Sequence, residues 1–489
     1  MFLGIDLGTS SVKLLLMEKD GEVIKTLTKD YSLSFPKPTW AEQNPNEWWE
    51  VTKNGIKEIL QNADKISLKG ISFSGQMHGL VILDKDDEVI RPAILWCDQR
   101  TEKECNYLNN EIGVEKISEY TGNMALTGFT APKILWVKNN EPENFEKIRK
   151  IMLPKDYISY MLSGKFATDT SDASGMLILD VKNRKWSKEM IDILSIKEEM
   201  LPKVYESYEV VGNIKKELAK EFEVLENVKI IIGGGDQAVG AVGTGAVKEG
   251  LVSVALGTSG VIFAPLKNYE ADKNNRLHSF CHANGEYHQM GVMLSAAGAL
   301  KWWVENINNS EDYLKINEDI EKICIGSENL YFLPYLIGER TPHNDSNAKG
   351  CFIGLSITHT NAHMSRAVME GISFALNDSM EILKDMGIKI EKIRISGGGS
   401  KSKVWKQILS DIFNAEVCSI NVSEGPALGA AILSAVGCGE YKTVNEACEV
   451  IVKDKEIVEP IKDNVEIFAK HYDKFKNLYP LLKETFKNL

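Results

Sequence analysis

Two aspartates stand beside glycine-rich turns, where their side chains could do chemistry. Asp6 ends a short apolar run and precedes Leu7-Gly8-Thr9-Ser10, while Asp236 directly follows three glycines. Mg²⁺ prefers few carboxylates together with phosphate oxygens, so Asp6 suits a magnesium partner, bound directly or through water. The glycines before Asp236 let a ligand approach the backbone and leave this carboxylate as the only reactive group. The ordinary alternative is that each aspartate simply caps a turn.

A glycine-threonine-serine turn occurs twice, about half a chain apart. The copies are Gly8-Thr9-Ser10-Ser11 and Gly257-Thr258-Ser259-Gly260, and each follows an apolar run. Such turns present free backbone N–H groups and hydroxyls, which bind phosphate. One such turn is usually only a tight hairpin, but two in equivalent positions favour a polyphosphate held from both sides of a cleft. The copies differ in charge, because Asp6 aligns with Ala255 and Lys13 with Ile262.

Further turns of interest follow other strand-like segments. Met77 and His78 lie in the turn after residues 69–73, although a lone histidine is more often structural than a ligand-binding residue. A glycine turn at 397–399 separates a predicted strand over 392–395 from a predicted helix over 402–413. Another helix, beginning at Pro426, is lined with small residues that would let a second backbone or a flat ligand approach closely.

Several familiar motifs are absent or incomplete. The chain contains neither G-x-x-x-x-G-K-[ST] nor G-x-G-x-x-G, which disfavours a Walker-type NTPase and a dinucleotide-binding enzyme. Ser10 and Lys13 form S-x-x-K, but the S-D-N and K-T-G motifs of that hydrolase class do not occur. Cys281, His282 and His288 match no standard zinc spacing, so we expect them in a strand pair.

Positioning these turns requires an α/β architecture. The opening residues predict an antiparallel meander, with strands over 11–19 and 22–28 joined by an Asp20-Gly21 hairpin. A helix should follow, capped by Asn44, with Pro45 at its first position and Glu47 completing a capping box. Strands and helices then alternate, which favours helices layered on sheets. The repeated turn suggests two copies of one domain, which we place at residues 1–243 and 244–489.

Length and composition agree with two globular domains. The chain has 489 residues, of which 43% are hydrophobic and 26% charged, and its formal net charge is −12. An acidic chain repels phosphodiester backbones, so we expect no nucleic-acid partner. The eight cysteines are scattered, and neither a basic signal segment nor a membrane-length apolar stretch is present. We therefore expect a soluble cytoplasmic protein without a membrane partner. The sequence leaves open whether the protein forms a homodimer.

Together these residues resemble the FGGY family of carbohydrate kinases. Both sequence signatures of that family are recognisable, one at 128–140 and one running from 350–355 to 367–370, and the resemblance covers nearly the whole chain. It implies two ribonuclease-H-like domains of the actin-like ATPase superfamily, with a ligand cleft between them. It also implies a sugar kinase that uses ATP and Mg²⁺.

Within the family, residues 40–45, 74–79 and 338–343 are most similar to the members that phosphorylate the ketose D-xylulose. This resemblance implies that Met77 and His78 contact the ketose, that Asp236 binds it and accepts its hydroxyl proton, and that Asp6 organises Mg²⁺. One departure is Cys97, because many relatives carry asparagine or another residue before the following aspartate. We do not expect this departure to change the class.

The resemblance also divides ATP between turns of the two halves. The predicted nucleotide-binding residues are Gly8, Thr9, Ser10, Ser11, Lys13, Gly257, Thr258 and Ser259 around the phosphates, and Gly298, Gly397, Gly398, Gly399 and Ser402 around the adenosine.

Two alternatives stay open. A family member acting on glycerol, ribulose or a deoxyketose would keep the fold, and the Met77-His78 pair argues against it. An actin- or Hsp70-like ATPase switch would not need Met77, His78 and Asp236. Stimulation of ADP production by a ketose would separate a kinase from such a switch.

Overall fold

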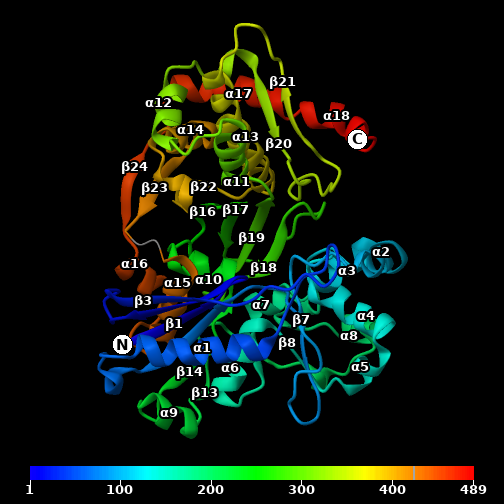
Figure 1. Cartoon of the computed structure of the whole chain (residues 1–489), viewed down its shortest axis with the longest axis vertical. Helices are drawn as coiled ribbons and strands as arrows, with labels where there is room; N and C mark the ends of the chain where they lie inside the picture. The colour runs from blue at the N-terminus through cyan, green and yellow to red at the C-terminus, as the bar shows by residue number, and fades with distance from the viewer. Residues whose placement is uncertain (422–423) are drawn as a thin grey trace.

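The computed structural model describes residues 1–421 and 424–489, which fold into two halves, each containing a seven-stranded sheet (Figure 1). The first sheet has the order β13-β14-β5-β1-β2-β3, with β15 beside β5. Its strands are β1 (Phe2–Leu7), β2 (Ser11–Met17), β3 (Val23–Asp30), β5 (Gly70–Gly75), β13 (Val210–Asn213), β14 (Lys229–Ile231) and β15 (Gly234–Gly235). The second has the order β18-β19-β17-β16-β22-β23-β24. Its strands are β16 (Gly250–Leu256), β17 (Gly260–Leu266), β18 (His278–Cys281), β19 (Tyr287–Met293), β22 (Ile390–Ser396), β23 (Glu416–Ile420) and β24 (Asp454–Val458).

Helices and short strand pairs surround these sheets. The α-helices are α1 (Pro45–Ile59), α2 (Glu102–Asn106), α3 (Val114–Thr121), α4 (Thr130–Asn140), α5 (Pro142–Lys147), α6 (Pro154–Ser163), α7 (Thr170–Ser174), α8 (Lys188–Leu194), α9 (Lys216–Phe222), α10 (Asp236–Gly243), α11 (Ala297–Lys301), α12 (Tyr313–Glu321), α13 (Asn361–Asp385), α14 (Lys403–Phe413), α15 (Gly425–Gly437), α16 (Val444–Ile451), α17 (Lys462–Phe475) and α18 (Leu478–Phe486). The short pairs are β4 (Glu42–Gln43) with β7 (Ala93–Ile94), β6 (Val81–Leu83) with β8 (Lys150–Met152), β9 (Ala167–Asp169) with β12 (Lys203–Tyr205), β10 (Leu179–Asp180) with β11 (Lys185–Trp186), and β20 (Tyr331–Pro334) with β21 (Gly350–Ile353).

The two sheets repeat one pairing pattern. In the first half, β1 is antiparallel to β2 and parallel to β5. In the second half, β16 is antiparallel to β17 and parallel to β22. The predicted meander of β1, β2 and β3 is present, and so is the predicted α/β class with two ribonuclease-H-like domains.

The two hairpins nevertheless differ by one residue. Leu7 pairs with Val12, which leaves four residues in the first turn, whereas Leu256 pairs with Gly260 and leaves three in the second. Asp6 therefore faces Lys13 across the first hairpin, but Ala255 faces Val261 and not Ile262. Side chains alternate between the two faces of a strand, and residues paired across a hairpin share a face. Lys13 therefore lies on the same face as Asp6, whereas Ile262 lies on the opposite face from Ala255.

Helix α1 begins as the sequence predicts, with one correction. The Asn44 side chain accepts a hydrogen bond from the Asn46 N–H, and Pro45 occupies the first helical turn. The predicted capping box is wrong, because the Glu47 carboxylate instead accepts hydrogen bonds from the backbone N–H and hydroxyl of Ser32. A tertiary partner thus outcompetes the local cap. The helix lies close to the sheet at Gly55, where an added Cβ would lie 2.8 Å from Leu14.

The junction between the halves is built from small residues. Helix α15, which lies between β23 and β24 in sequence, packs on α10 and on β1 of the first sheet (Figure 1). A Cβ added at Gly429 would lie 1.9 Å from the Val239 carbonyl oxygen, and one at Gly4 would lie 2.1 Å from that of Ala427. The small-residue helix at 425–437 therefore admits a second backbone. This contact places α10, whose first residue is Asp236, against a helix from the second half of the sequence.

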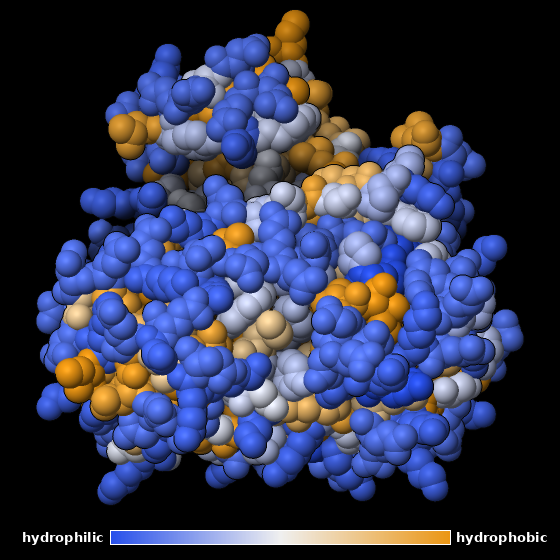
Figure 2. Space-filling view, turned by 60° about the horizontal axis from the view of Figure 1, so that its bottom comes forward, coloured by the Kyte–Doolittle hydropathy of each residue, from blue (hydrophilic) through white to orange (hydrophobic). Residues whose placement is uncertain are grey.

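The surface gives no sign of a membrane-spanning element in the described part of the chain. Among residues 1–421 and 424–489, no helix has both the length and the apolar character needed to cross a bilayer. The face shown in Figure 2 is mainly hydrophilic, with apolar patches interrupted by polar side chains.

Candidate active site

Three parallel strand ends bring the two predicted catalytic aspartates to the same edge of the first sheet. Strand β5 pairs with β1 on one side and β15 on the other, with Asp6 opposite Ser74 and Ser74 opposite Gly234. Asp6 and Asp236 thus flank the end of β5. The chain leaving β5 carries Met77 and His78, so the turn predicted to bind a ketose begins at the same edge.

A cavity of about 180 Å³ opens at this edge. Met77, His78 and Asp236 line it from the first half, and Ser259 and Arg340 line it from the second. The remaining lining residues are Trp96, Leu126, Gly128, Phe129, Gln237, Val261, Met290 and Val292. The structure therefore brings the predicted sugar residues together with one member of the second glycine-threonine-serine turn. Their roles stay predictions.

The electrostatic environment of Asp236 suits a base. Burial raises the pKa of the Asp236 carboxyl to about 7, and the nearby negative charge of Asp6 acts in the same direction. Hydrogen bonding from Gln237 opposes this shift. A carboxyl with a pKa near neutrality is a stronger proton acceptor than an ordinary aspartate, yet it remains substantially ionised.

Asp6 has the features of a cation ligand. Its Oδ1 atom is buried and has no hydrogen-bond partner among residues 1–421 and 424–489. Burial also raises the pKa of the Asp6 carboxyl, while Ser74 and the charge of Lys13 oppose the shift. Lys13 itself is held in an ion pair with Glu424. A divalent cation beside Asp6 would satisfy the unpartnered oxygen and restore its ionised form, so this site fits Mg²⁺.

His78 is held as a neutral ring by its neighbours. Its backbone has a φ of 70°, and its Nδ1 lies 2.7 Å from the Gly175 carbonyl oxygen. Burial lowers the pKa of His78 to about 3. A carbonyl can only accept, so Nδ1 carries the proton and Nε2 is left as a hydrogen-bond acceptor. Gly175 must lack a side chain, because its Cβ would lie 2.5 Å from His78 Nδ1.

Residues of the first family signature hold the backbone of this histidine in place. The Thr130 hydroxyl and the Lys133 ammonium both donate to the His78 carbonyl oxygen, at 3.0 and 2.8 Å. Lys133 is fully buried, and burial lowers its pKa to about 7 while Asp98 opposes the shift. The Phe129 ring packs 4.8 Å from the His78 ring. Thr130 and Lys133 therefore act on the cavity through His78, whereas Gly128 and Phe129 line it themselves.

A buried charge cluster supports the Asp236 turn. The Lys155 ammonium lies 2.5 Å from Asp156, 3.0 Å from Asp169 and 3.6 Å from Asp172, and all four residues are inaccessible to solvent. Asp169 accepts hydrogen bonds from the Ser171 backbone and hydroxyl, and the Ser171 Oγ in turn accepts from the Gly235 N–H at 3.1 Å. This chain of contacts fixes the backbone immediately before Asp236.

The first glycine-threonine-serine turn is fixed by side chains of its own half. The Trp96 indole N–H donates to the Thr9 hydroxyl at 2.9 Å, and the Gln43 amide donates to the Thr9 carbonyl at 2.7 Å. Within the turn, the Gly8 N–H donates to the Ser11 carbonyl at 3.0 Å. Trp96 also lines the cavity, so this turn adjoins it.

The predicted nucleotide residues of the second half gather around the second turn. The Gly298 N–H donates to the Thr258 carbonyl at 3.1 Å, and an added Cβ at Gly298 would lie 2.8 Å from the same oxygen. Gly397 abuts Leu256, because an added Cβ at Gly397 would lie 2.5 Å from the Leu256 carbonyl oxygen. Ser402 caps α14 through the Trp405 N–H, and its hydroxyl donates to Asn317. Ser402 therefore already has structural partners.

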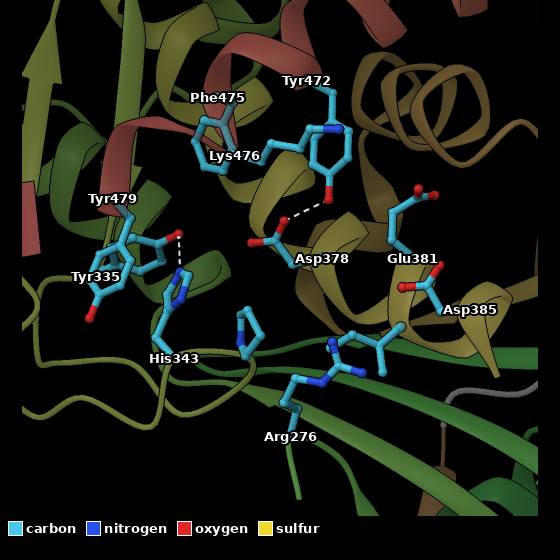
Figure 3. A pocket seen from close by; sticks show the side chains of 12 residues that line it. Arg276, Tyr335, His343, Asp378, Glu381, Asp385, Tyr472, Phe475, Lys476 and Tyr479 are labelled. Atoms are coloured by element: carbon cyan, nitrogen blue, oxygen red, sulfur yellow. Dashed lines mark hydrogen bonds between the residues drawn. The ribbon is translucent and has the colours of Figure 1, made fainter. Parts of the chain in front are cut away.

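A second cavity, of about 240 Å³, lies between α13 and α17 (Figure 3). Its lining includes Asp378, Tyr472, Arg276 and His343, and contains none of the residues predicted from sequence. The Tyr472 hydroxyl donates to the Asp378 carboxylate at 2.6 Å. The chemistry predicted from the sequence belongs to the smaller cavity, where Asp236 lies.

Sequence reasoning missed three groups at the smaller cavity or beneath it. Arg340 sits in the segment 338–343, whose family-like sequence suggests no role for it. Lys133 falls within the first signature, again without a role. Lys155 and the aspartates around it could not be identified from the sequence. Lysine is almost never fully buried unless it is paired, so a buried Lys155 was not to be expected from the sequence alone.

Comparisons with known proteins give matches over nearly the whole chain. Residues 1–243 match the model of the FGGY family of carbohydrate kinases, N-terminal domain, and residues 252–438 match that of the C-terminal domain. The xylulose kinase of Bacillus subtilis is 38% identical over 485 residues, which cover 99% of this chain and 97% of the relative. That of Escherichia coli is 40% identical over 450 residues, covering 91% and 92%. The crystal structure of a xyloylose kinase from Brucella ovis is 35% identical, has a TM-score of 0.94 and aligns over 99% of both chains.

Proposed function

The chain belongs to the FGGY family of carbohydrate kinases, and on that premise we propose that it transfers the γ-phosphoryl group of ATP to D-xylulose. The products would be ADP and D-xylulose 5-phosphate. Support for this sugar comes from the relatives named xylulose kinases, which match nearly the full chain. As a carbohydrate kinase, the protein uses ATP as the phosphoryl donor.

The observation that carries the proposal is the convergence of Met77, His78 and Asp236 on one cavity. The ketose would lie there with its terminal hydroxyl at Asp236. As the hydroxyl oxygen attacks the γ-phosphorus, its proton passes to the Asp236 carboxylate and the bond to ADP breaks. The transition state of such a transfer is loose, so the proton can leave late and positioning supplies most of the acceleration.

His78 and Met77 would orient the sugar. With Nδ1–H committed to Gly175, His78 offers Nε2 as an acceptor for a sugar hydroxyl. Met77 packs closely against Gly235 of β15, where an added Cβ would lie 2.9 Å from Met77 Cγ. The sugar-side methionine thus contacts the residue immediately before Asp236.

Mg²⁺ would be held by Asp6, either directly or through water, and when bound it would neutralise charge on the phosphates. The residues at 8–11 and 257–259 would hold those phosphates, and Gly298 and 397–399 would border the adenosine. We keep the boundary near residue 243, so that sugar and nucleotide approach mainly from opposite domains. All eight cysteines are unpaired, which supports a reducing compartment such as the cytoplasm.

A panel of sugars tests the proposal. Purified protein is given ATP, Mg²⁺ and, in separate reactions, D-xylulose, ribulose, a deoxyketose or glycerol, and ADP formation is measured. D-xylulose should give the highest kcat/KM and should raise ADP formation well above the rate without sugar. A higher kcat/KM for glycerol than for every ketose would refute the substrate and keep the family. Sugar-independent ATP turnover would instead favour an ATPase switch.

A further inference from the structure

Arg340 places an unpartnered cation in the cavity. It belongs to the segment between β20 and β21 of the second half and lines the space opposite Met77 and Asp236. Across residues 1–421 and 424–489, its guanidinium has no ion pair and donates no hydrogen bond. Burial lowers the pKa of Arg340, and the negative charge of Glu339 opposes this shift. Arg340 is only partly buried and lines the cavity, so a ligand that accepts hydrogen bonds can reach its guanidinium there.

The backbone around Arg340 is rigidly held. The Glu339 Oε1 atom accepts hydrogen bonds from the Arg340 N–H at 2.7 Å and from the Leu294 N–H at 2.9 Å. Thr341 bonds in both directions with Val292 of β19, through its N–H and its hydroxyl, at 3.0 Å each. Arg340 is thus clamped between two residues that are both anchored to the chain at 292–294.

The far side of the same segment is anchored in the second cavity (Figure 3). There the His343 ring stacks on Tyr479 with 3.8 Å between ring centroids, and His343 Nε2 lies 3.1 Å from the Tyr335 hydroxyl. With both sides of the segment fixed, the Arg340 backbone is held in place beside the smaller cavity. A fixed backbone reduces the entropy that the segment loses when a ligand binds.

The charge of Arg340 acts on two neighbouring histidines. Burial lowers the pKa of both His78 and His278, and the positive charge of Arg340 acts in the same direction. Burial raises the pKa of Asp236, and there the negative charge of Asp6 acts in the same direction. Phe129 joins the two histidines, with ring centroids 4.8 Å from His78 and 5.7 Å from His278. Arg340 thus acts electrostatically on the histidines of this region, whereas Asp6 acts on Asp236.

We propose that Arg340 binds the keto end of the sugar, by donating hydrogen bonds to the C1 hydroxyl and C2 carbonyl oxygens of a ketose. A guanidinium only donates and presents a planar fork, which matches two neighbouring oxygens. His78 Nε2 accepts a hydrogen bond from a sugar hydroxyl. Arg340 and His78 together therefore recognise oxygen acceptors and a hydroxyl donor of the same sugar. This inference rests on the proposed sugar kinase activity and assigns the residue that sets its preference for a ketose.

The test compares D-xylulose with 1-deoxy-D-xylulose, which lacks the C1 hydroxyl, in the wild type and in Arg340→Met and Arg340→Lys. Loss of a charge-assisted hydrogen bond in a buried site should raise the KM for D-xylulose by about 10- to 100-fold. The KM for ATP should stay within about twofold of the wild-type value, because the proposal assigns Arg340 to the sugar and not to the phosphates. The wild type should favour D-xylulose over the deoxy sugar, and the ratio of the two kcat/KM values should fall toward one in Arg340→Met.

Arg276→Met is the matched control. Arg276 belongs to the same half, and its guanidinium is paired with Asp272 outside the smaller cavity. Its substitution should leave the sugar ratio unchanged. If Arg340→Met fails to fold, Arg340→Lys keeps the charge and the bulk, and should still lose sugar discrimination because it lacks the fork. Added guanidinium ion should partly restore the activity of an Arg340→Ala protein toward D-xylulose, which a purely structural defect would not allow.

Two outcomes overturn the inference. An unchanged ratio of D-xylulose to 1-deoxy-D-xylulose in every Arg340 variant would show that the guanidinium does not read the C1 end. A fall in kcat together with a higher KM for ATP would place Arg340 on the phosphates instead. The proposed function fails separately, in the wild-type protein, if another sugar is preferred to D-xylulose.

Discussion

The two glycine-threonine-serine turns share a sequence and a sheet position but differ in what surrounds them. The first turn follows Asp6, adjoins the cavity through Trp96, and is bordered by the Lys13–Glu424 ion pair. The second follows Ala255 and is packed closely by Gly298 and Gly397. The hairpins also differ in length by one residue. A duplicated backbone has thus become one charged site and one tightly packed, uncharged site.

This asymmetry fits a division of labour in phosphoryl transfer. Charge is needed where a metal and a proton are handled, and in this molecule both carboxylates flank the end of β5 in the first half. Close glycine packing is useful where a flat or phosphorylated ligand must approach the backbone. Substitutions that change only one of the two turns test whether the turns play different parts.

The largest effect is expected at Asp236. Asp236→Asn removes the proton acceptor while keeping the size of the side chain, so kcat should fall by ~10²–10⁴-fold with little change in ATP binding. Steady-state kinetics with D-xylulose and a nucleotide-binding titration measure the two quantities. Asp192→Asn, at an exposed position of α8, is the control and should behave as the wild type. Turnover of Asp236→Asn within a few-fold of wild type would remove the base assignment.

A smaller effect, with a pH signature, is expected at Asp6. The negative charge of Asp6 raises the pKa of Asp236, so Asp6→Asn should lower that pKa from about 7. The ionised base would then persist to lower pH, and the acidic limb of kcat/KM should move in that direction. Activity should also fall by roughly 10- to 100-fold, as is typical when metal organisation is lost, and its dependence on Mg²⁺ should weaken.

Ala255→Asn makes the matching change at the second turn. Asp6→Asn and Ala255→Asn then place the same side chain at the aligned position of one turn each, in two separate proteins. If the turns play different parts, Ala255→Asn should change activity only a few-fold and leave the acidic limb in place. Equal losses from Asp6→Asn and Ala255→Asn, with no shift in the pH profile, would mean that the charge of Asp6 has no special role.

Local patterns in the sequence were enough for the architecture. The Asp20-Gly21 hairpin, the Asn44 cap and the repeated turn depend on neighbouring residues, so the opening meander and the duplication of the domain could be predicted from them. The capping box failed because Glu47 has a tertiary partner in Ser32, which no local pattern reveals. The one-residue difference between the hairpins likewise depends on cross-strand pairing and not on the aligned sequences.

The residue types of the candidate site were predictable from the sequence, but their pKa values and protonation states were not. Asp6, Met77, His78 and Asp236 stand in recognisable turns, but the raised pKa of Asp236 comes from burial and from Asp6 on the far side of β5. Burial keeps His78 neutral, and the Gly175 carbonyl, 97 residues away in sequence, sets which ring nitrogen carries the proton. Arg340 lies in a loop where an arginine is ordinarily solvent-exposed, so only the fold shows that it enters the cavity.

The smallest effect is expected from the close packing of the second turn. Gly397 has a φ of +84°, and a Cβ there would lie 2.5 Å from the Leu256 carbonyl oxygen. Gly387 has nearly the same φ, +83°, but a Cβ there would meet nothing within 4 Å. Both Gly→Ala variants should lose ~1–3 kcal/mol of unfolding free energy through backbone strain. Gly397→Ala should lose roughly 1–3 kcal/mol more, because its methyl group must displace the Leu256-Gly257 backbone.

The KM for ATP separates this packing from a general loss of stability. If the second turn holds the phosphates, moving Leu256-Gly257 should raise the KM for ATP several-fold in Gly397→Ala and leave it unchanged in Gly387→Ala. Urea unfolding and ATP titrations at saturating D-xylulose measure both effects in the same proteins. Equal stabilities and equal KM values for the two variants would show that the second turn tolerates displacement. The close glycine contacts would then serve folding alone, and the first turn would have to hold the phosphates without help from the second.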